Sequence, residues 1–402
     1  MPDEKAAEER ANVLARAIAG FGLESVRQPE PTTVPDEVWP RLLSRVRAEG
    51  LTGLAVESVD SGWLELADDQ AAMLLAVHRS AMTWCLLVER KLIGLAEAFD
   101  SQGIGFAVLK GASIAHTMYP EPSARSFADL DLLVSTVDYD RACAMLGSLG
   151  NERQRPEPRP GFEVRFGKAS VHKDPKDGIE VDLHRTLVLG PFGLWIDPEE
   201  LLLRREPFLL ADRKLGRLGD TAMLLNVAIH ASLGTRPPKL VPLRDIAQVW
   251  AEGDIDWDTL VRWAEAWHLT VVLQHAFAAV GDTLNTPIPT EAACFVGERP
   301  SRSEAKLLAG YTSSRRDKGG MTLATIRAIP GARSKAAYAW ALAFPDRRFL
   351  EARAGAHAKA SYLRRWSVPV RWAGSRLASR RGARRDTAVS AGSGQIGKEN
   401  RA

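Results

Sequence analysis

Two aspartates stand two positions apart in the short apolar run DLDLLV, residues 129–134. In an extended strand, such residues point to the same side, so Asp129 and Asp131 would place their carboxylates on one face, roughly 7 Å apart at the backbone. Neighbouring carboxylates repel and are costly unless a cation or a donor satisfies them. Because Mg²⁺ is typically held by one or two carboxylates plus substrate phosphates, the pair predicts a divalent-cation site. The alternative is two solvated acids on a half-exposed strand.

A third carboxylate follows in IEVDLH, residues 179–184. The strict alternation of this segment predicts a strand with Asp182 on the same face as Glu180 and His184. A turn signal, PKDG, precedes it, and a further strand is expected at residues 164–173. The resulting hairpin would bring Asp182 beside the first two acids.

A lysine and a glycine stand between the apolar run FAVL, residues 106–109, and a short predicted helix at residues 112–118. Gly111 allows the backbone to approach an anion, and Lys110 adds a positive charge at the same place. Carboxylates that bind a metal beside such a turn favour phosphoryl or nucleotidyl transfer.

The order of these elements resembles the nucleotidyltransferase superfamily of the DNA polymerase beta type. More narrowly, LKG, then Arg125 ahead of DLDLLV, then VDLH, resemble the bacterial family of uncharacterised nucleotidyltransferases. The later patterns DxxxLLNxxxH, LRDIAxxW, IDWDxLVRWAEAW and PIP resemble the helical half of the same family. The resemblance therefore covers most of the chain between Trp39 and Phe349.

The resemblance implies an enzyme that moves a nucleoside monophosphate from an NTP, such as ATP, to an unidentified acceptor hydroxyl or phosphate and releases pyrophosphate. Mg²⁺, or Mn²⁺, would be the cofactor. Asp129, Asp131 and Asp182 would be the metal ligands and catalytic residues, and Asp182 would also take the proton of the attacking hydroxyl.

Lys110, Gly111, Ser113 and Arg125 would bind the nucleotide. The superfamily usually has Gly-Gly or Gly-Ser at this turn, whereas here Gly111 is followed by alanine and the serine comes one position later. The planar donor fork of Arg125 suits phosphate; the alternative is a solvated loop arginine.

Two other classes of function remain open. One is a non-catalytic relative that keeps the fold and binds a partner, as an antitoxin-like or regulatory module would. The other is a sugar-nucleotide glycosyltransferase, in which an acid-x-acid pair also holds a metal. The second reading leaves Lys110, Gly111 and Asp182 unexplained.

Several other polar residues are expected to have structural roles. His184 matches the family pattern, so we expect it to orient an acid rather than bind the metal. We expect Glu180 to be either such an orienting residue or an exposed residue of an edge strand. A histidine on an apolar helix, as His230 is, is usually a satisfied core residue. Arg244 and Asp245 are expected to pair with each other.

The elements predict an α+β fold, a small mixed β-sheet nucleotidyltransferase domain flanked by mainly helical N- and C-terminal parts. The expected divisions are a helical region at 1–85, the catalytic domain at 86–215, a helical domain at 216–300, a helical extension at 301–362 and a basic, disordered tail at 363–402. The arginine-rich tail is expected to be solvated, or to contact an anionic membrane surface or a nucleic acid.

Composition is ordinary for a globular protein: 402 residues, 45% apolar, 26% charged and a net charge of +3. The three cysteines lie far apart without metal-type spacing, as expected in a reducing compartment. The N-terminus, MPDEKAAEERA, is unlike a signal peptide. With no apolar run expected to cross a bilayer, these features predict a cytoplasmic protein without a transmembrane segment.

Overall fold

The computed structural model describes residues 2–24, 26, 30–234, 238–297, 300–312 and 318–354. The basic tail predicted at 363–402 lies outside the described residues.

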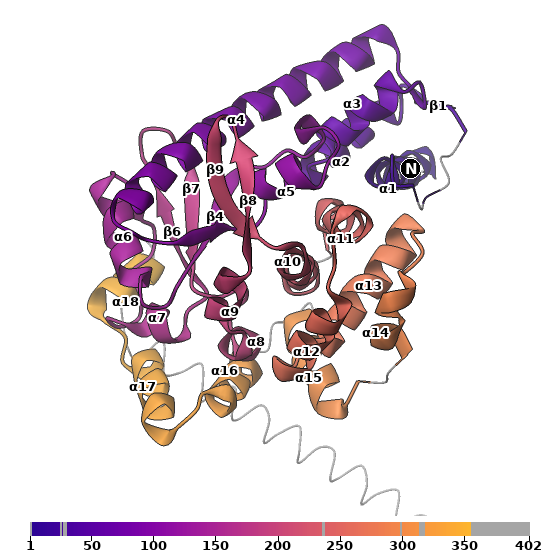
Figure 1. The fold of residues 1–402 in the computed structure, drawn as a ribbon. Helices are drawn as coiled ribbons and strands as arrows, with labels where there is room; N and C mark the ends of the chain where they lie inside the picture. Colours follow the sequence, from indigo (N-terminus) through magenta and orange to yellow (C-terminus); the bar gives the residue numbers. More distant parts are fainter. Residues whose placement is uncertain are drawn as a thin grey trace, which may run out of the picture.

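A mixed sheet of seven strands in the order β5-β6-β7-β4-β3-β9-β8 forms the centre of the molecule (Figure 1). β4 runs parallel to β7, and β3 runs parallel to β9, while the other neighbours are antiparallel. The fold is α+β with a mixed sheet, as the sequence predicted. The strands are β3 (Phe106–Val108), β4 (Asp129–Val134), β5 (Glu152–Arg153), β6 (Ala169–Lys173), β7 (Glu180–His184), β8 (Arg205–Leu210) and β9 (Arg213–Leu218).

Two parts of the sheet differ from the sequence-based expectation. The strand expected at residues 164–173 is only half extended, because Phe162–Phe166 forms the short helix α7 ahead of β6. The rings of Phe162 and Phe166 both pack on Tyr338, at centroid distances of 5.5 and 5.2 Å, which a helical turn allows. The β8–β9 hairpin was not anticipated.

One face of the sheet is covered by the helices α4 (Asp68–Ser101) and α6 (Tyr139–Ser148) (Figure 1). The alternate residues of β4 and β7 that point to this side are apolar and fully buried, as period-two patterning requires. These residues are Leu130, Leu132, Val134, Val181 and Leu183. The acids are thereby forced to the opposite face.

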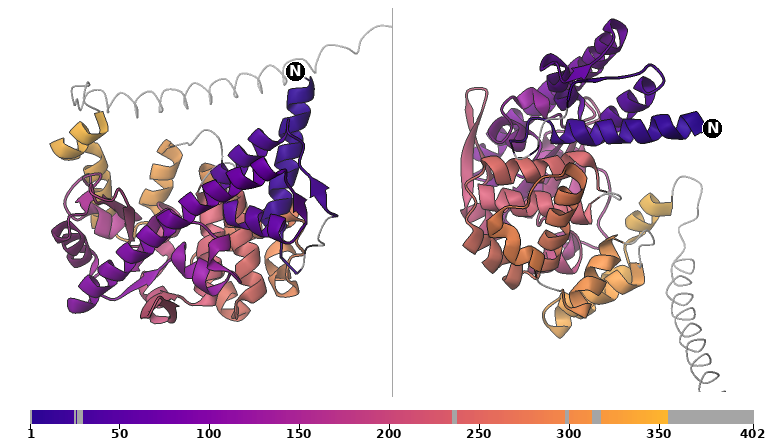
Figure 2. Two further views of the ribbon diagram at one scale, coloured as in Figure 1. Left: turned by 90° about the horizontal axis from the view of Figure 1, so that it is seen from above. Right: turned by 90° about the vertical axis from the view of Figure 1, so that its right-hand side faces the viewer.

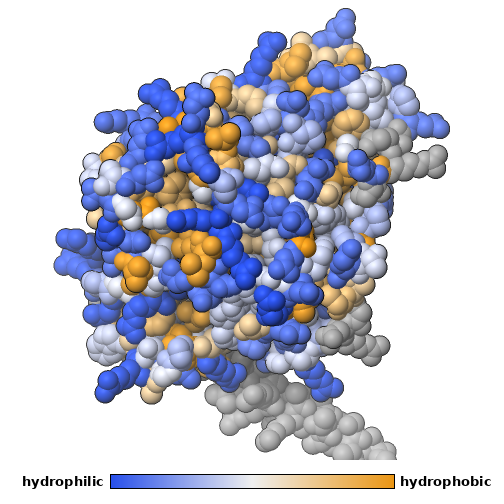
Figure 3. All heavy atoms as spheres, in the orientation of Figure 1, coloured by the Kyte–Doolittle hydropathy of each residue, from blue (hydrophilic) through white to orange (hydrophobic). Residues whose placement is uncertain are grey.

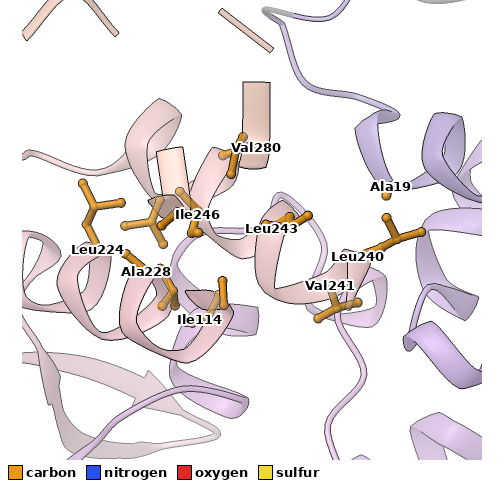
Figure 4. Close-up of a cluster of buried hydrophobic side chains, with 14 of the residues drawn as sticks. Ala19, Ile114, Leu224, Ala228, Leu240, Val241, Leu243, Ile246 and Val280 are labelled. Atoms are coloured by element: carbon orange, nitrogen blue, oxygen red, sulfur yellow. The ribbon is translucent and has the colours of Figure 1, made fainter. Parts of the chain in front are cut away.

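Helices from both ends of the chain pack together beside the sheet. The close-up in Figure 4 shows apolar side chains such as Ile114, Leu224 and Ile246 meeting in this layer. Asp220 is the first residue of the helix α10 (Asp220–Leu233), after the N-cap Gly219, and its carboxylate accepts hydrogen bonds from Arg217 and from the amide of Asp254. The helices nearest this layer are α1 (Pro2–Gly20), α2 (Trp39–Glu49), α3 (Thr52–Asp60), α5 (Ala112–Thr117), α10 (Asp220–Leu233), α11 (Leu240–Glu252), α12 (Trp257–Ala266) and α13 (Thr270–Leu284).

The remaining elements are short. The helices are α8 (Pro191–Trp195), α9 (Pro198–Leu203), α14 (Ala293–Gly297), α15 (Arg302–Thr312), α16 (Lys318–Ala328), α17 (Ala332–Ala343) and α18 (Arg347–Ala354), with 3-10 turns at Pro122–Ala124 and Thr290–Ala292. Thr32–Thr33 and Leu64–Glu65 form a two-stranded sheet, β1 and β2.

α4 joins the N-terminal helices to the sheet as one continuous helix of 34 residues (Figures 1 and 2). The domain boundary expected at residues 85/86 falls inside this helix. A single apolar cluster also extends from α1 through the sheet to α13. The N-terminal helices thus share a core with one face of the sheet, where β4 contributes Leu133, while the other apolar residues of β4 and β7 belong to the cluster on the opposite face.

α4 also corrects the expectation that no segment is long and apolar enough to cross a bilayer. Of the described helices, α4 alone is long and apolar enough to cross a bilayer, judged by length and composition. Only 17% of its most apolar stretch is buried. A core helix of a soluble protein can pass the same test, so the indication is weak. Its exposed apolar residues include Met73, Leu75, Leu86 and Leu87. Apolar atoms gather over its upper end in Figure 3.

Candidate active site

The two acid-bearing strands lie side by side in parallel register. Asp131 is opposite Asp182, and Asp129 is opposite Glu180. Since facing residues of paired strands point to the same side, the carboxylates predicted from the sequence share one face of the sheet.

Three ligand atoms, one each from Asp131, Asp182 and His184, lie within 4.8 Å of one another. Two carboxylates and an imidazole form a donor set that a divalent cation such as Mg²⁺ or Mn²⁺ can use, so the residues fit the cofactor that was predicted. Asp129 is not a member of this cluster; its side chain is 44% exposed at the start of β4. The structure therefore brings two of the three expected ligands together and leaves the third at the rim.

Both carboxylate oxygens of Asp131 already have partners. The ammonium of Lys110 contacts Oδ2, and the Nε2 of His184 lies 2.8 Å from Oδ1. Burial favours the protonated acid, but Lys110 and His184 outweigh burial and hold the pKa of Asp131 well below its usual range.

His184 itself is held from both sides. Its Nδ1 lies 3.2 Å from the carbonyl oxygen of Thr186, and its Nε2 faces Asp131. Both partners are acceptors, so both hydrogen bonds form only when each ring nitrogen carries a proton. The contact places His184 where it could orient Asp131; that role stays a prediction.

Asp182 differs from Asp131, because it forms no ion pair with any residue that the structure describes. Burial and the nearby charge of Asp131 raise the pKa of Asp182. His184 and Lys168 act in the opposite direction but do not outweigh these effects, so ionised Asp182 carries an electrostatic cost that a bound cation would relieve.

A second lysine, Lys168, lies at the same site and was missed by sequence reasoning. It precedes β6, and its carbonyl accepts the amide of Arg185 at 2.8 Å, next to His184 at the end of β7. Burial lowers the pKa of Lys168, and Asp131 and Asp182 act in the opposite direction. Within the described chain, its ammonium forms no ion pair. No motif marked Lys168, because only strand pairing brings it to the acids.

Lys110 and Gly111 form the turn between β3 and α5. Gly111 has φ +67°, a conformation that favours glycine, and an added Cβ would lie 3.4 Å from Phe127. Ser113 follows on α5, but it is completely buried and its hydroxyl has no hydrogen-bond partner among the described residues. Contact between Ser113 and a nucleotide stays a prediction.

Arg125 is engaged in a buried ion pair with Asp245. Its Nε and Nη2 donate to the two carboxylate oxygens at 2.8 and 2.9 Å, and the hydroxyl of Tyr119 donates to the same carboxylate at 2.9 Å. The expected Arg244–Asp245 pair is wrong: Arg244 donates to Gln248 at 2.7 Å and to backbone carbonyls. Neighbouring residues on a helix point about 100° apart, so they reach different partners. Phosphate contact by Arg125 remains a prediction.

A cavity of about 990 Å³ opens beside the acids. One wall is Lys110, Gly111 and Asp129, and the opposite wall comes from α4. His230 also lines it and is partly exposed, and burial lowers its pKa to about 4. The α4 residues that line the cavity are Ala76, Val77, Ser80, Ala81, Thr83, Trp84 and Leu87. Of the three acids, Asp129 is the one that lines this cavity, and Asp131 adjoins it through its contact with Lys110.

Comparisons with known proteins identify the family of this chain. A family model described as "Uncharacterised nucleotidyltransferase" matches residues 35–285, more than half of the chain. The comparison with curated proteins gave no match. Among solved structures, an antigenic nucleotidyltransferase-like protein from Paracoccidioides brasiliensis is 16% identical, with a TM-score of 0.31 over 52% of this chain and 95% of that one. That structural likeness is too low to bear on the fold.

Proposed function

This chain belongs to the family of uncharacterised nucleotidyltransferases, and from that premise we propose that it transfers a nucleoside monophosphate from an NTP to an acceptor hydroxyl or phosphate. The reaction would depend on Mg²⁺ or Mn²⁺ and release pyrophosphate. The acceptor is unidentified.

One observation carries the proposal: carboxylates from two different strands, Asp131 and Asp182, converge beside Lys110, which lines the cavity together with Gly111 and Asp129. A chain that used these acids only as a solvated surface would have no reason to bury them together, because burial of neighbouring carboxylates is costly.

The residues have separate roles in this proposal. A bound divalent cation would neutralise phosphate charge and align the reacting groups. Asp131 and Asp182 would hold it, with Asp129 contributing from the rim. His184 keeps Asp131 in place through its hydrogen bond. Asp182 is also suited to take the proton of the attacking hydroxyl, because no lysine or arginine of the described chain is paired with it.

The test is a screen of the four NTPs with Mg²⁺ or Mn²⁺, which measures pyrophosphate release and mass-shifted products. We expect Asp131→Asn to reduce turnover by about 10²- to 10³-fold or more, the scale of losing one preorganised charge-stabilising group, in a chain that stays folded. Glu180→Gln is the matched control, since Glu180 is exposed on the same strand face and pairs with Lys173 at 3.3 Å. Normal turnover by Asp131→Asn would end the metal hypothesis.

A second function is favoured by a different observation: Lys110 and His184 already satisfy Asp131 without a metal. A non-catalytic, partner-binding relative would retain such a closed arrangement. Absence of Mg²⁺-dependent NTP binding by the purified protein would favour this alternative. We also propose that the protein is located in the cytoplasm.

A further inference from the structure

The ammonium of Lys110 lies where a cation would meet the paired acids. It contacts Oδ2 of Asp131 and is 3.7 Å from Oδ1 of Asp129. Its side chain is only 18% exposed, so little water competes for it. One lysine thus bridges both carboxylates of the DLD segment.

The remaining oxygen of Asp131 is not free either, because His184 takes Oδ1. A cation that binds Asp131 therefore competes with Lys110 for Oδ2, and a cation that binds Oδ1 of Asp129 competes with the same ammonium. Two positive charges cannot share these oxygens without strong repulsion.

Space for the displaced ammonium is adjacent. Lys110 lines the cavity together with Gly111 and Asp129. The flexible four-carbon stem of a lysine allows its ammonium to swing while the backbone stays in place. An anionic group of a ligand in that cavity would give the ammonium a new partner.

We propose that Lys110 is a positioning residue that takes the place of the divalent cation between Asp129 and Asp131, and passes to a phosphate of the NTP when cation and nucleotide bind. This inference rests on the proposed function. In this role, Lys110 opposes binding of the metal alone but assists binding of the nucleotide. A lysine with a merely structural role would not have opposite effects on two ligands.

The experiment measures binding, not turnover, with Mn²⁺ followed by electron paramagnetic resonance and a non-hydrolysable α,β-methylene analogue of ATP followed by calorimetry. We expect Lys110→Met to bind Mn²⁺ about three- to tenfold more tightly, because an ion pair that competes with the metal is gone, and to bind the analogue about tenfold more weakly, since a charged contact is lost. Lys110→Arg keeps the charge and should bind Mn²⁺ like the wild type.

The control is Lys173→Met, which removes a lysine paired with Glu180 on the neighbouring strand pair and should leave both affinities unchanged. Lys110→Gln, which keeps a polar side chain, is measured as well in case the methionine variant unfolds. If Lys110 variants that fold bind Mn²⁺ equally or more weakly than the wild type, the exchange role is wrong while the nucleotidyltransferase proposal stands. If the wild type binds neither Mn²⁺ nor the analogue, the proposed function fails as well.

Discussion

Two buried charge clusters of this protein are built in opposite ways. At the junction of sheet and helices, Arg125, Asp245 and Tyr119 form a closed set: both oxygens of the carboxylate accept a hydrogen bond from the guanidinium, and the hydroxyl adds a third. At the acid site, Lys110 serves two carboxylates, while Asp182 and Lys168 form no ion pair within the described chain.

The difference separates a cluster whose charges are satisfied internally from one that leaves charges open to a ligand. A closed ion pair with good geometry ties two segments together, and breaking it exposes a buried charge. An open cluster is kept at a cost to stability, which is typical of sites that bind or transform a ligand. Substitutions in the two clusters should therefore act on different properties.

The largest effect on stability is expected from Asp245→Asn. It leaves the Arg125 guanidinium buried without a counter-charge, which costs about 3–5 kcal/mol in unfolding free energy. Glu252→Gln, at an exposed position of the same helix, is the control. Urea unfolding measures the free energy of unfolding of both variants. If Asp245→Asn loses less than about 1 kcal/mol, the Arg125–Asp245 pair stabilises the protein no more than an ordinary surface ion pair does, and the two clusters do not differ as described.

A smaller effect, on substrate binding alone, is expected from Lys168→Met. The ammonium of Lys168 lies beside the acids and forms no ion pair with the residues that the structure describes, so it is available to phosphate. Its removal should raise KM for the NTP about tenfold, the scale of one charged hydrogen bond. The unfolding transition should not change. Lys173→Met, at the far end of β6, reports any general effect of losing a lysine. Equal KM values for the two variants would leave Lys168 without a role.

The smallest effect is expected from Asp182→Asn. This variant should raise the free energy of unfolding, whereas Asp245→Asn should lower it. Burial and Asp131 raise the folded-state pKa of Asp182 above its unfolded value. Ionised Asp182 therefore costs stability near pH 7, and this cost disappears as the pH falls through the folded and then the unfolded pKa. The variant should be about 1 kcal/mol more stable near pH 7, with no advantage below about pH 3. Destabilisation near neutral pH would mean that neighbouring groups stabilise the ionised carboxylate of Asp182, as Arg125 and Tyr119 stabilise that of Asp245.

Much of the site was readable from the sequence because its strands are short and strictly alternating. DLDLLV and EVDLH each place acids on one face and buried aliphatic residues on the other, and the parallel pairing of β4 with β7 follows that pattern. The Lys110–Gly111 turn was marked by the apolar run before it.

Other features depend on tertiary pairing that local sequence does not encode. β8 and β9 carry arginine, lysine and glutamate at exposed positions, so only Phe208, Leu210 and Leu215 hint at their alternation. Arg125 reaches Asp245 across 120 positions of the chain. Lys168 meets the acids only because β6 pairs with β7.

The most direct test of the central claim is the affinity of the protein for Mn²⁺ in solution, with Asp182→Asn compared with Glu180→Gln. If carboxylates from β4 and β7 hold one cation together, Asp182→Asn should weaken Mn²⁺ binding by at least about tenfold, the loss of one charged ligand. Glu180→Gln should bind like the wild type. Equal Mn²⁺ affinities for Asp182→Asn and the wild type would contradict the account.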